Sequence, residues 1–168
     1  SLLRHKSAIS SKAEFIEGSS FHRVLWDDAQ KGTSKIKLVS DSKIKQVVLC
    51  SGKVYYDLLE KRDKLNLKNT YILRIEQIYP VPIQALTKEL SRFKNAALIW
   101  CQEEPKNQGA WSFMEPNIEQ ILNNLSIKAK RAKYVGRPAS ASPATGLASQ
   151  HKEQQDKLIF EALNLEGK

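Results

Sequence analysis

From Ile44 onward, short apolar segments alternate with longer segments of helical periodicity, and this alternation most constrains the fold. The short segments have the length of strands and cover residues 44–50, 71–75, 97–101 and 129–135. The segments that follow them repeat apolar residues every three or four positions and cover residues 53–65, 83–93, 113–125 and about 149–163. Four strand–helix repeats predict an α/β fold of three layers, in which helices cover both faces of a mostly parallel sheet.

The amino-terminal quarter of the chain lacks this periodicity. Residues 1–43 are rich in Ser and Lys and hold one apolar cluster, at residues 21–26. We therefore expect 1–43 to be an irregular connector from a preceding domain, and 44–168 to be the α/β domain. Ser1 stands where an initiator Met would be, which suggests a fragment of a longer protein. Trp26 and Trp111 are expected to anchor the packing.

Composition narrows the class of protein. The 168 residues are 41% hydrophobic and 27% charged, which is typical of a globular domain with a core of its own. The longest apolar run, residues 96–101, is far too short to cross a membrane. The two cysteines exclude a disulfide scaffold and a multi-cysteine zinc site, and they favour a reducing compartment.

The formal net charge of +9 comes mainly from the two ends of the chain. Its densest basic cluster lies in 128–133, where lysines suit a solvated strand edge that resists aggregation. A nucleic-acid partner is disfavoured, because the aromatic–glycine pattern of an RRM and the G-x-x-G of a KH domain are missing.

Residues with catalytic potential are few. The glycines never form G-x-G-x-x-G, and Ser51-Gly52-Lys53 is more typical of an ordinary strand–helix turn than of a phosphate site. No histidine has a partner at metal-ligand spacing. Glu103 and Glu104 follow a strand, but neighbouring residues point in different directions, so a solvated or interface role is favoured over acid–base chemistry. We therefore predict no catalytic and no metal-binding residue in this chain.

In open parallel sheets, ligands gather at the carboxyl ends of the strands. The segments expected there are 51–52, 76–77, 102–104 and 136–142. The last of these opens the turn-rich sequence Gly-Arg-Pro-Ala-Ser-Ala-Ser-Pro-Ala-Thr-Gly.

Four long motifs resemble one known family. They are Cys-Ser-Gly-Lys-Val-Tyr-Tyr-Asp-Leu at 50–58, Arg-Ile-Glu-Gln-Ile-Tyr-Pro at 74–80, Gln-Glu-Glu-Pro-Lys-Asn-Gln-Gly-Ala-Trp at 102–111, and the stretch 134–146. With Leu-Leu-Arg-His-Lys near the start, they resemble the carboxyl-terminal domain of the first, decarboxylating component of 2-oxoglutarate dehydrogenase complexes. The resemblance implies the third domain of transketolase-like enzymes, whose sheet has one antiparallel edge. The basic strand 129–135 fits that edge best.

The resemblance also implies a function for the whole protein. Such proteins use thiamine diphosphate and Mg²⁺ to decarboxylate 2-oxoglutarate in the tricarboxylic acid cycle. They pass the succinyl group to the lipoyl group of a dihydrolipoyl succinyltransferase, and they work as homodimers in the bacterial cytoplasm or the mitochondrial matrix. Because the preceding domains hold the cofactor, no catalytic or cofactor-binding residue is implied here, and the fragment alone is expected to be inactive.

For this domain the resemblance implies support of the dimer and, in some relatives, an effector pocket for acetyl-CoA or AMP. The implied effector residues are Ser20, Arg23 and Gln77, whereas Gln84 and Ala85 stand where responsive relatives carry a basic pair. Independently of the resemblance, the two acids, the proline and the Gly-Ala-Trp sequence of residues 102–111 predict an interface and packing role for Glu103, Glu104 and Trp111. A regulatory α/β module that binds a nucleotide or coenzyme A is the alternative function, with neither a nucleic acid nor a membrane as partner.

Overall fold

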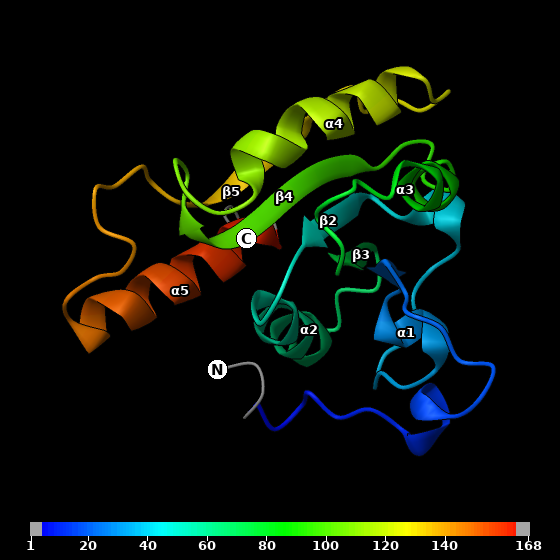
Figure 1. Cartoon of the computed structure of the whole chain (residues 1–168), viewed down its shortest axis with the longest axis horizontal. Helices are drawn as coiled ribbons and strands as arrows, with labels where there is room; N and C mark the ends of the chain where they lie inside the picture. Colours follow the sequence, from blue (N-terminus) through cyan, green and yellow to red (C-terminus); the bar gives the residue numbers. More distant parts are fainter. Residues whose placement is uncertain (1–4, 164–168) are drawn as a thin grey trace.

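The computed structural model describes residues 5–163 and is an α/β fold built on one five-stranded sheet (Figure 1). The strands are β1 (Val24–Leu25), β2 (Gln46–Cys50), β3 (Thr70–Ile75), β4 (Ala97–Pro105) and β5 (Ala132–Arg137), and their order in the sheet is β1-β3-β2-β4-β5. Strands β2 to β5 run parallel, while β1 pairs antiparallel with β3. The predicted fold class is confirmed.

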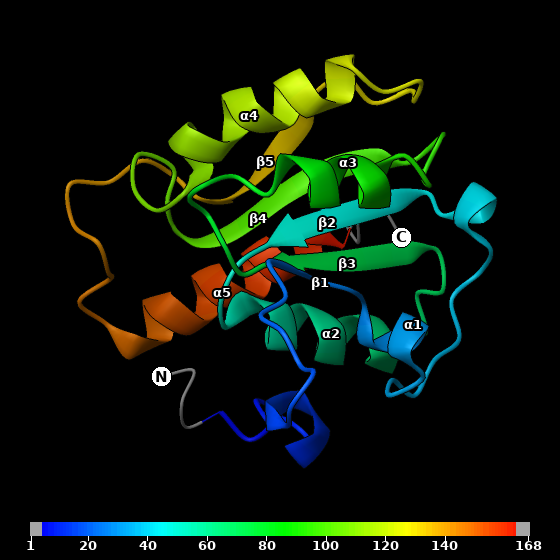
Figure 2. The same cartoon turned by 45° about the vertical axis from the view of Figure 1, so that its right-hand side comes forward.

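Helices cover both faces of the sheet, as Figure 2 shows. They are α1 (Asp28–Lys31), α2 (Val54–Lys64), α3 (Ile83–Leu90), α4 (Trp111–Asn123) and α5 (Ala148–Ala162). Short 3-10 turns lie at Lys12–Phe15 and Asp41–Lys43. Helices α3 and α4 pack on one face, and α2 and α5 pack on the other. The three predicted layers are therefore present.

The central strand β2 shows why the sequences of the strands are unbroken apolar runs. All five of its residues are buried. Val47 and Leu49 face the core under α3 and α4, whereas Val48 and Cys50 face the core under α2 and α5. Side chains alternate across a strand, so a strand covered on both faces has no polar face to show.

The antiparallel edge is not the strand that we expected. The basic strand β5 does lie at an edge, but it runs parallel to β4, and the antiparallel strand is β1 at the opposite edge. Two residues are too few to carry a strand periodicity, which is why the pattern did not indicate β1. On β5, Lys133 forms a salt bridge with Glu161 at 3.1 Å, so the basic character of this strand is partly neutralised locally.

The two expected tryptophan anchors differ. Trp111 is buried, with 5% of its surface exposed, but Trp26 is 47% exposed, so the prediction for Trp26 is wrong. In the amino-terminal segment, β1 belongs to the sheet and α1 contacts it through the Tyr71–Gln30 hydrogen bond, whereas most of the residues 5–23 are exposed. The domain boundary at residue 44 stays a prediction.

Candidate functional site

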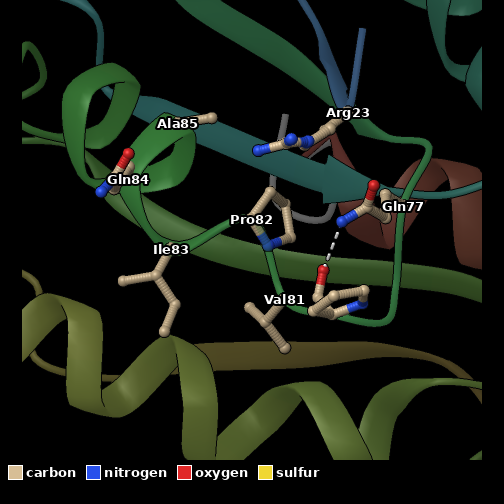
Figure 3. Close-up of a pocket in the computed structure, with 8 residues that line it drawn as sticks. Arg23, Gln77, Val81, Pro82, Ile83, Gln84 and Ala85 are labelled. Carbon is tan, nitrogen blue, oxygen red and sulfur yellow. Dashed lines mark hydrogen bonds between the residues drawn. The ribbon is translucent and has the colours of Figure 1, made fainter. Parts of the chain in front are cut away.

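A cavity of about 400 Å³ lies where the segment before β1 meets the carboxyl end of β3. Figure 3 shows its lining, in which Arg23 lies across from the turn that leads into α3. The lining residues are Arg23, Gln77, Pro80, Val81, Pro82, Ile83, Gln84 and Ala85. Two of the three predicted effector residues, Arg23 and Gln77, are thus brought together.

Backbone hydrogen bonds hold these two residues side by side. The Arg23 carbonyl accepts the N–H groups of Glu76 and Gln77 at 2.9 and 3.1 Å. The Gln77 side chain donates from Nε2 to the Pro80 carbonyl at 2.6 Å and so fixes the turn on the far side of the cavity (Figure 3). Gln77 therefore shapes the cavity as well as lining it, and its carbonyl oxygen is left to accept a hydrogen bond.

The Arg23 guanidinium has no salt bridge with any residue in 5–163. The nearby acids in the sequence are engaged elsewhere: Asp27 pairs with Arg62, and Asp28 lies 3.8 Å from Lys31. Arg23 is consequently the positive group of this cavity that an anion could meet.

The third predicted effector residue, Ser20, lies outside that cavity. It lines a neighbouring hollow of about 640 Å³, together with Phe21, Trp26 and Lys88 among others. Arg23 lines both hollows. Ser20 and Gln77 therefore line different hollows, which share Arg23 and Ala85, and a common effector role for Ser20, Arg23 and Gln77 stays a prediction.

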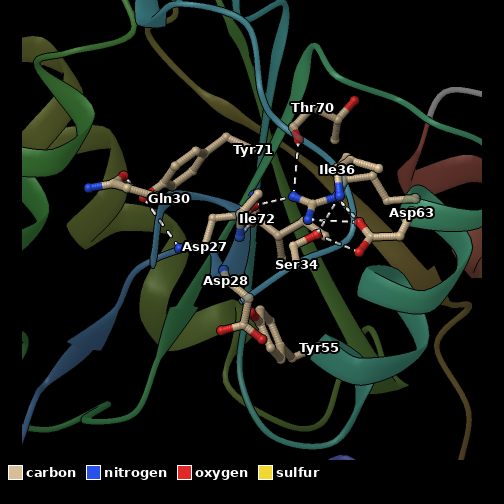
Figure 4. Close-up of polar contacts among 12 residues, drawn as sticks. Asp27, Asp28, Gln30, Ser34, Ile36, Tyr55, Asp63, Thr70, Tyr71 and Ile72 are labelled. Carbon is tan, nitrogen blue, oxygen red and sulfur yellow. Dashed lines mark hydrogen bonds and ion pairs between the residues drawn. The ribbon is translucent and has the colours of Figure 1, made fainter. Parts of the chain in front are cut away.

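A buried ion pair fixes the segment that follows Arg23, which includes the strand β1. Asp27 and Arg62 are both fully buried and are hydrogen-bonded to each other. Figure 4 shows the polar contacts around Asp27. The same carboxylate accepts the N–H groups of Ile72 at 2.7 Å and Ala29 at 2.8 Å. Burial raises the pKa of Asp27, and the attraction of Arg62 opposes that rise. Asp27 thus joins β1, α1 and β3 at one point, a role that its sequence position did not indicate.

The segment 102–111 folds around the side-chain amide of Gln102. Gln102 is buried, and its Oε1 accepts from the Trp100 indole at 2.9 Å and from the Trp111 backbone N–H at 3.0 Å. Its Nε2 donates to the Gln108 carbonyl at 2.8 Å. A polar residue directly after an apolar strand is the only sequence signal for this role.

The predicted interface residues of that segment differ in environment. Glu103 accepts from Lys53 and Gln155 at 3.0 Å each, inside the chain. Partial burial alone would lower the pKa of Lys53, but hydrogen bonds to Asp57 and Glu103 outweigh it and the pKa is raised. Glu104 is exposed, and Trp111 packs against Tyr134 with ring centroids 5.3 Å apart. Their role in an interface stays a prediction.

Residues 5–163 contain neither a cluster of metal-ligating side chains nor an accessible thiol. No three His, Cys, Asp or Glu side chains in that range lie together in a way that could hold a metal ion. Cys50 and Cys101 are buried on adjacent strands, and burial raises the pKa of both thiols, which keeps them protonated. Over the same residues, no helix combines the length and the apolar character that a membrane span requires.

Comparison with known proteins shows to which family the chain belongs. Residues 9–163 match the family described as "2-oxoglutarate dehydrogenase C-terminal". The proteins named "2-oxoglutarate dehydrogenase E1 component" of Brucella ovis and Brucella canis are each 57% identical to it over 164 residues, which are 97% of this chain and 16% of each relative. The chain thus spans about a sixth of these relatives. With its parallel sheet and its antiparallel edge strand, it belongs to the family of 2-oxoglutarate dehydrogenase C-terminal domains.

Proposed function

We propose that the chain is the carboxyl-terminal domain of an enzyme that decarboxylates 2-oxoglutarate oxidatively and transfers the succinyl group to a lipoyl-bearing second component. The observation that carries the proposal is the match over 97% of the chain to the E1 components named above. In this proposal the whole protein works as a homodimer, with a dihydrolipoyl succinyltransferase as its partner. Because the relatives are bacterial, we place the whole protein in the bacterial cytoplasm.

Thiamine diphosphate and Mg²⁺ would be held outside this chain. No carboxylate or histidine cluster in residues 5–163 fits a divalent cation, and the Ser51-Gly52-Lys53 turn places its lysine in salt bridges with Asp57 and Glu103. The domain therefore supplies no catalytic step in this proposal. Its part is to support the preceding domains and to bind an effector.

For the effector, we propose AMP or acetyl-CoA in the cavity that Arg23 and Gln77 line. The free guanidinium of Arg23 supplies a charge-assisted contact for one phosphate group, and the Gln77 carbonyl oxygen can accept from an adenine amine. Gln84 and Ala85 line the same cavity and add no charge. A ligand with one phosphate, such as AMP, therefore suits the cavity better than a ligand with several.

The enzymatic proposal is tested with the full-length protein. With thiamine diphosphate, Mg²⁺ and ferricyanide as electron acceptor, we expect turnover that depends on 2-oxoglutarate, and none from residues 1–168 alone. Turnover with a different 2-oxo acid and none with 2-oxoglutarate would contradict it. Binding of AMP or acetyl-CoA by a full-length protein without any such turnover would favour the regulatory module instead.

The effector proposal is tested by titration calorimetry of AMP and acetyl-CoA against the full-length protein. Loss of one charge-assisted hydrogen bond weakens binding by about 1.5–3 kcal/mol, so Arg23→Ala should raise the Kd roughly 10- to 150-fold. Arg131→Ala is the matched control, because the Arg131 side chain is 71% exposed on the opposite edge of the sheet. Equal Kd values for the wild type and Arg23→Ala would place the site elsewhere.

A further inference from the structure

Arg137, the last residue of β5, is buried without a counter-ion. Only 7% of its surface is exposed, yet no carboxylate in residues 5–163 lies within salt-bridge distance of it. Its Nε is enclosed and has no hydrogen-bond partner among those residues. An arginine is always charged, and a buried charge is costly unless an opposite charge or several acceptors meet it.

The buried Arg62 and the partly buried Arg74 are compensated, in contrast. Arg62 lies 2.9 Å from Asp63 as well as against Asp27, and Arg74 lies 2.7 Å from Glu76. Each of these guanidinium groups faces at least one carboxylate. Arg137 differs from them, because its single side-chain hydrogen bond in the described residues joins Nη2 to Nδ1 of His151, at 2.9 Å.

Arg137 lines a cavity of about 230 Å³ at the carboxyl ends of β4 and β5. The other lining residues are Pro105, Pro138, Ala139, Ser140, Ser142, Pro143, Ala144, Thr145 and Gln154. This end of a parallel sheet is where open α/β folds collect ligands. Part of its lining comes from the segment 136–142, which the sequence predicts to lie at that end of the sheet.

The loop around the cavity is held in place and keeps a donor free. Asn107 accepts the Ser140 N–H at 3.0 Å, and the Ser140 carbonyl accepts from Asn107 and Gln108 at 3.0 Å each. The Ser140 hydroxyl oxygen accepts the Ser142 N–H at 3.2 Å, and its hydrogen has no acceptor among residues 5–163. Ser140 can therefore donate to a group in the cavity.

The start of α5 lies near the cavity, whose lining includes Thr145 just before this helix and Gln154 within it, although residues 148–151 do not line it. His151 lies in the first turns of this 15-residue helix, whose N-cap, Leu147, supplies no side-chain cap. Unsatisfied N–H groups and the helix dipole favour an anion at such an end.

We propose that this cavity binds the phosphate group of a small ligand, with Arg137 as its main counter-ion. A phosphate group offers several acceptor oxygens, which suits the guanidinium and the Ser140 hydroxyl, both of which line the cavity. The volume admits a phosphate group with a small substituent but no nucleotide, because ligand sites of drug size take about 300–1,000 Å³. The site is separate from the Arg23 cavity, with which it shares no lining residue.

The test uses the full-length protein and inorganic phosphate as the probe, with sodium chloride at equal ionic strength as the reference. Calorimetry should give a saturable phosphate site, and phosphate should raise the melting temperature. Arg137→Met should weaken phosphate binding by at least about tenfold, as expected for the loss of a charge-assisted contact. Ser140→Ala should weaken binding by a smaller factor, without affecting the fold, because Ser140 is exposed.

Two further measurements separate this site from the alternatives. Without phosphate, Arg137→Met should melt no lower than the wild type, because removing an uncompensated buried charge offsets the loss of the hydrogen bond to His151. Arg23→Ala should leave the phosphate affinity unchanged, which separates this site from the proposed effector cavity. If Arg137→Met proves too unstable to titrate, Arg137→Lys replaces it and should still bind phosphate more weakly than the wild type.

The proposal fails if phosphate neither binds nor raises the melting temperature of the wild type. It also fails if the affinity survives in Arg137→Met or Arg137→Lys, or if Arg23→Ala abolishes it. Acetate that binds as tightly as phosphate would overturn the choice of a phosphate group and assign the cavity to a carboxylate.

Discussion

At the residue scale, the contact between Asp27 and Arg62 joins the amino-terminal segment to the sheet. Both side chains are fully enclosed, and Arg62 also lies 2.9 Å from Asp63, whose side chain is 13% exposed. A buried ion pair contributes little compared with two apolar residues, but losing one partner leaves a charge without compensation. The pair therefore stabilises the position of β1 and, with it, the place of Arg23 beside Gln77.

Replacing Arg62 tests this role. Arg62→Met leaves the Asp27 carboxylate buried without its cation, and we expect the free energy of unfolding to fall by about 3–5 kcal/mol. Urea denaturation of the chain, followed by circular dichroism, measures the change. Arg131→Met is the control and should stay within about 0.5 kcal/mol of the wild type, because the Arg131 side chain is 71% exposed. If Arg62→Met lowers the free energy of unfolding no more than Arg131→Met does, the ion pair does not stabilise the position of β1.

At the scale of the element, helix α4 is fixed at its first residue. Trp111 begins the helix, is almost fully buried, packs against Tyr134 of β5 and donates its backbone N–H to Gln102. The loop before the helix is folded around the same glutamine. The start of α4 and the ends of β4 and β5 therefore behave as one packed unit.

This unit gives a second stability prediction. Trp111→Ala should lower the free energy of unfolding by about 3–5 kcal/mol, as expected when a large buried aromatic side chain is truncated. Phe113→Ala is a matched control on the same helix, because Phe113 is 42% exposed, and it should cost much less. Thermal melts of both variants decide the point. Similar melting temperatures for the two variants would show that Trp111 is not the anchor of this element.

The elements that could be predicted from the sequence are those with long periodic segments. Residues 97–101 were expected as a strand, and β4 does begin at Ala97, but it runs on to Pro105 through polar residues and an irregular register. Its polar extension is stabilised by contacts distant in sequence, such as the Lys53–Glu103 salt bridge, which no local pattern encodes. The two residues of β1 likewise form a strand because they pair with β3, so no local sequence pattern indicates this strand.

The candidate site was predictable only in part. Gln77 and the segment 136–142 follow predicted parallel strands, so both are expected at the ligand-binding end of the sheet. Both line cavities there. That Ser20 lines a different hollow from Gln77 depends on how the amino-terminal segment crosses the edge of the sheet. The missing counter-ion of Arg137 also depends on the packing of β5 and α5, so a sequence alone gives no sign of it.

At the scale of the whole molecule, the amino-terminal segment is expected to be part of the folding unit as well as a connector. It supplies the strand that covers the outer edge of β3, the carboxylate that faces Arg62, and Asp41, which accepts from Arg92 at 2.9 Å. An unpaired outer edge of β3 would offer its backbone groups to other chains. Stability and solubility should therefore both depend on residues before 44.

Two truncated chains test this expectation. The chain 20–168 keeps β1, Asp27 and Asp41, and we expect it to unfold cooperatively with nearly the melting temperature of the chain 1–168. The chain 44–168 leaves the partly exposed Asp63 as the carboxylate beside Arg62, removes one of the two carboxylate partners of Arg92 and uncovers β3. Its free energy of unfolding should therefore fall by at least about 3 kcal/mol. Size-exclusion chromatography should also show self-association of 44–168 through the bared edge. Equal melting temperatures for the two chains would instead support the boundary at residue 44 and leave 1–43 as a connector only.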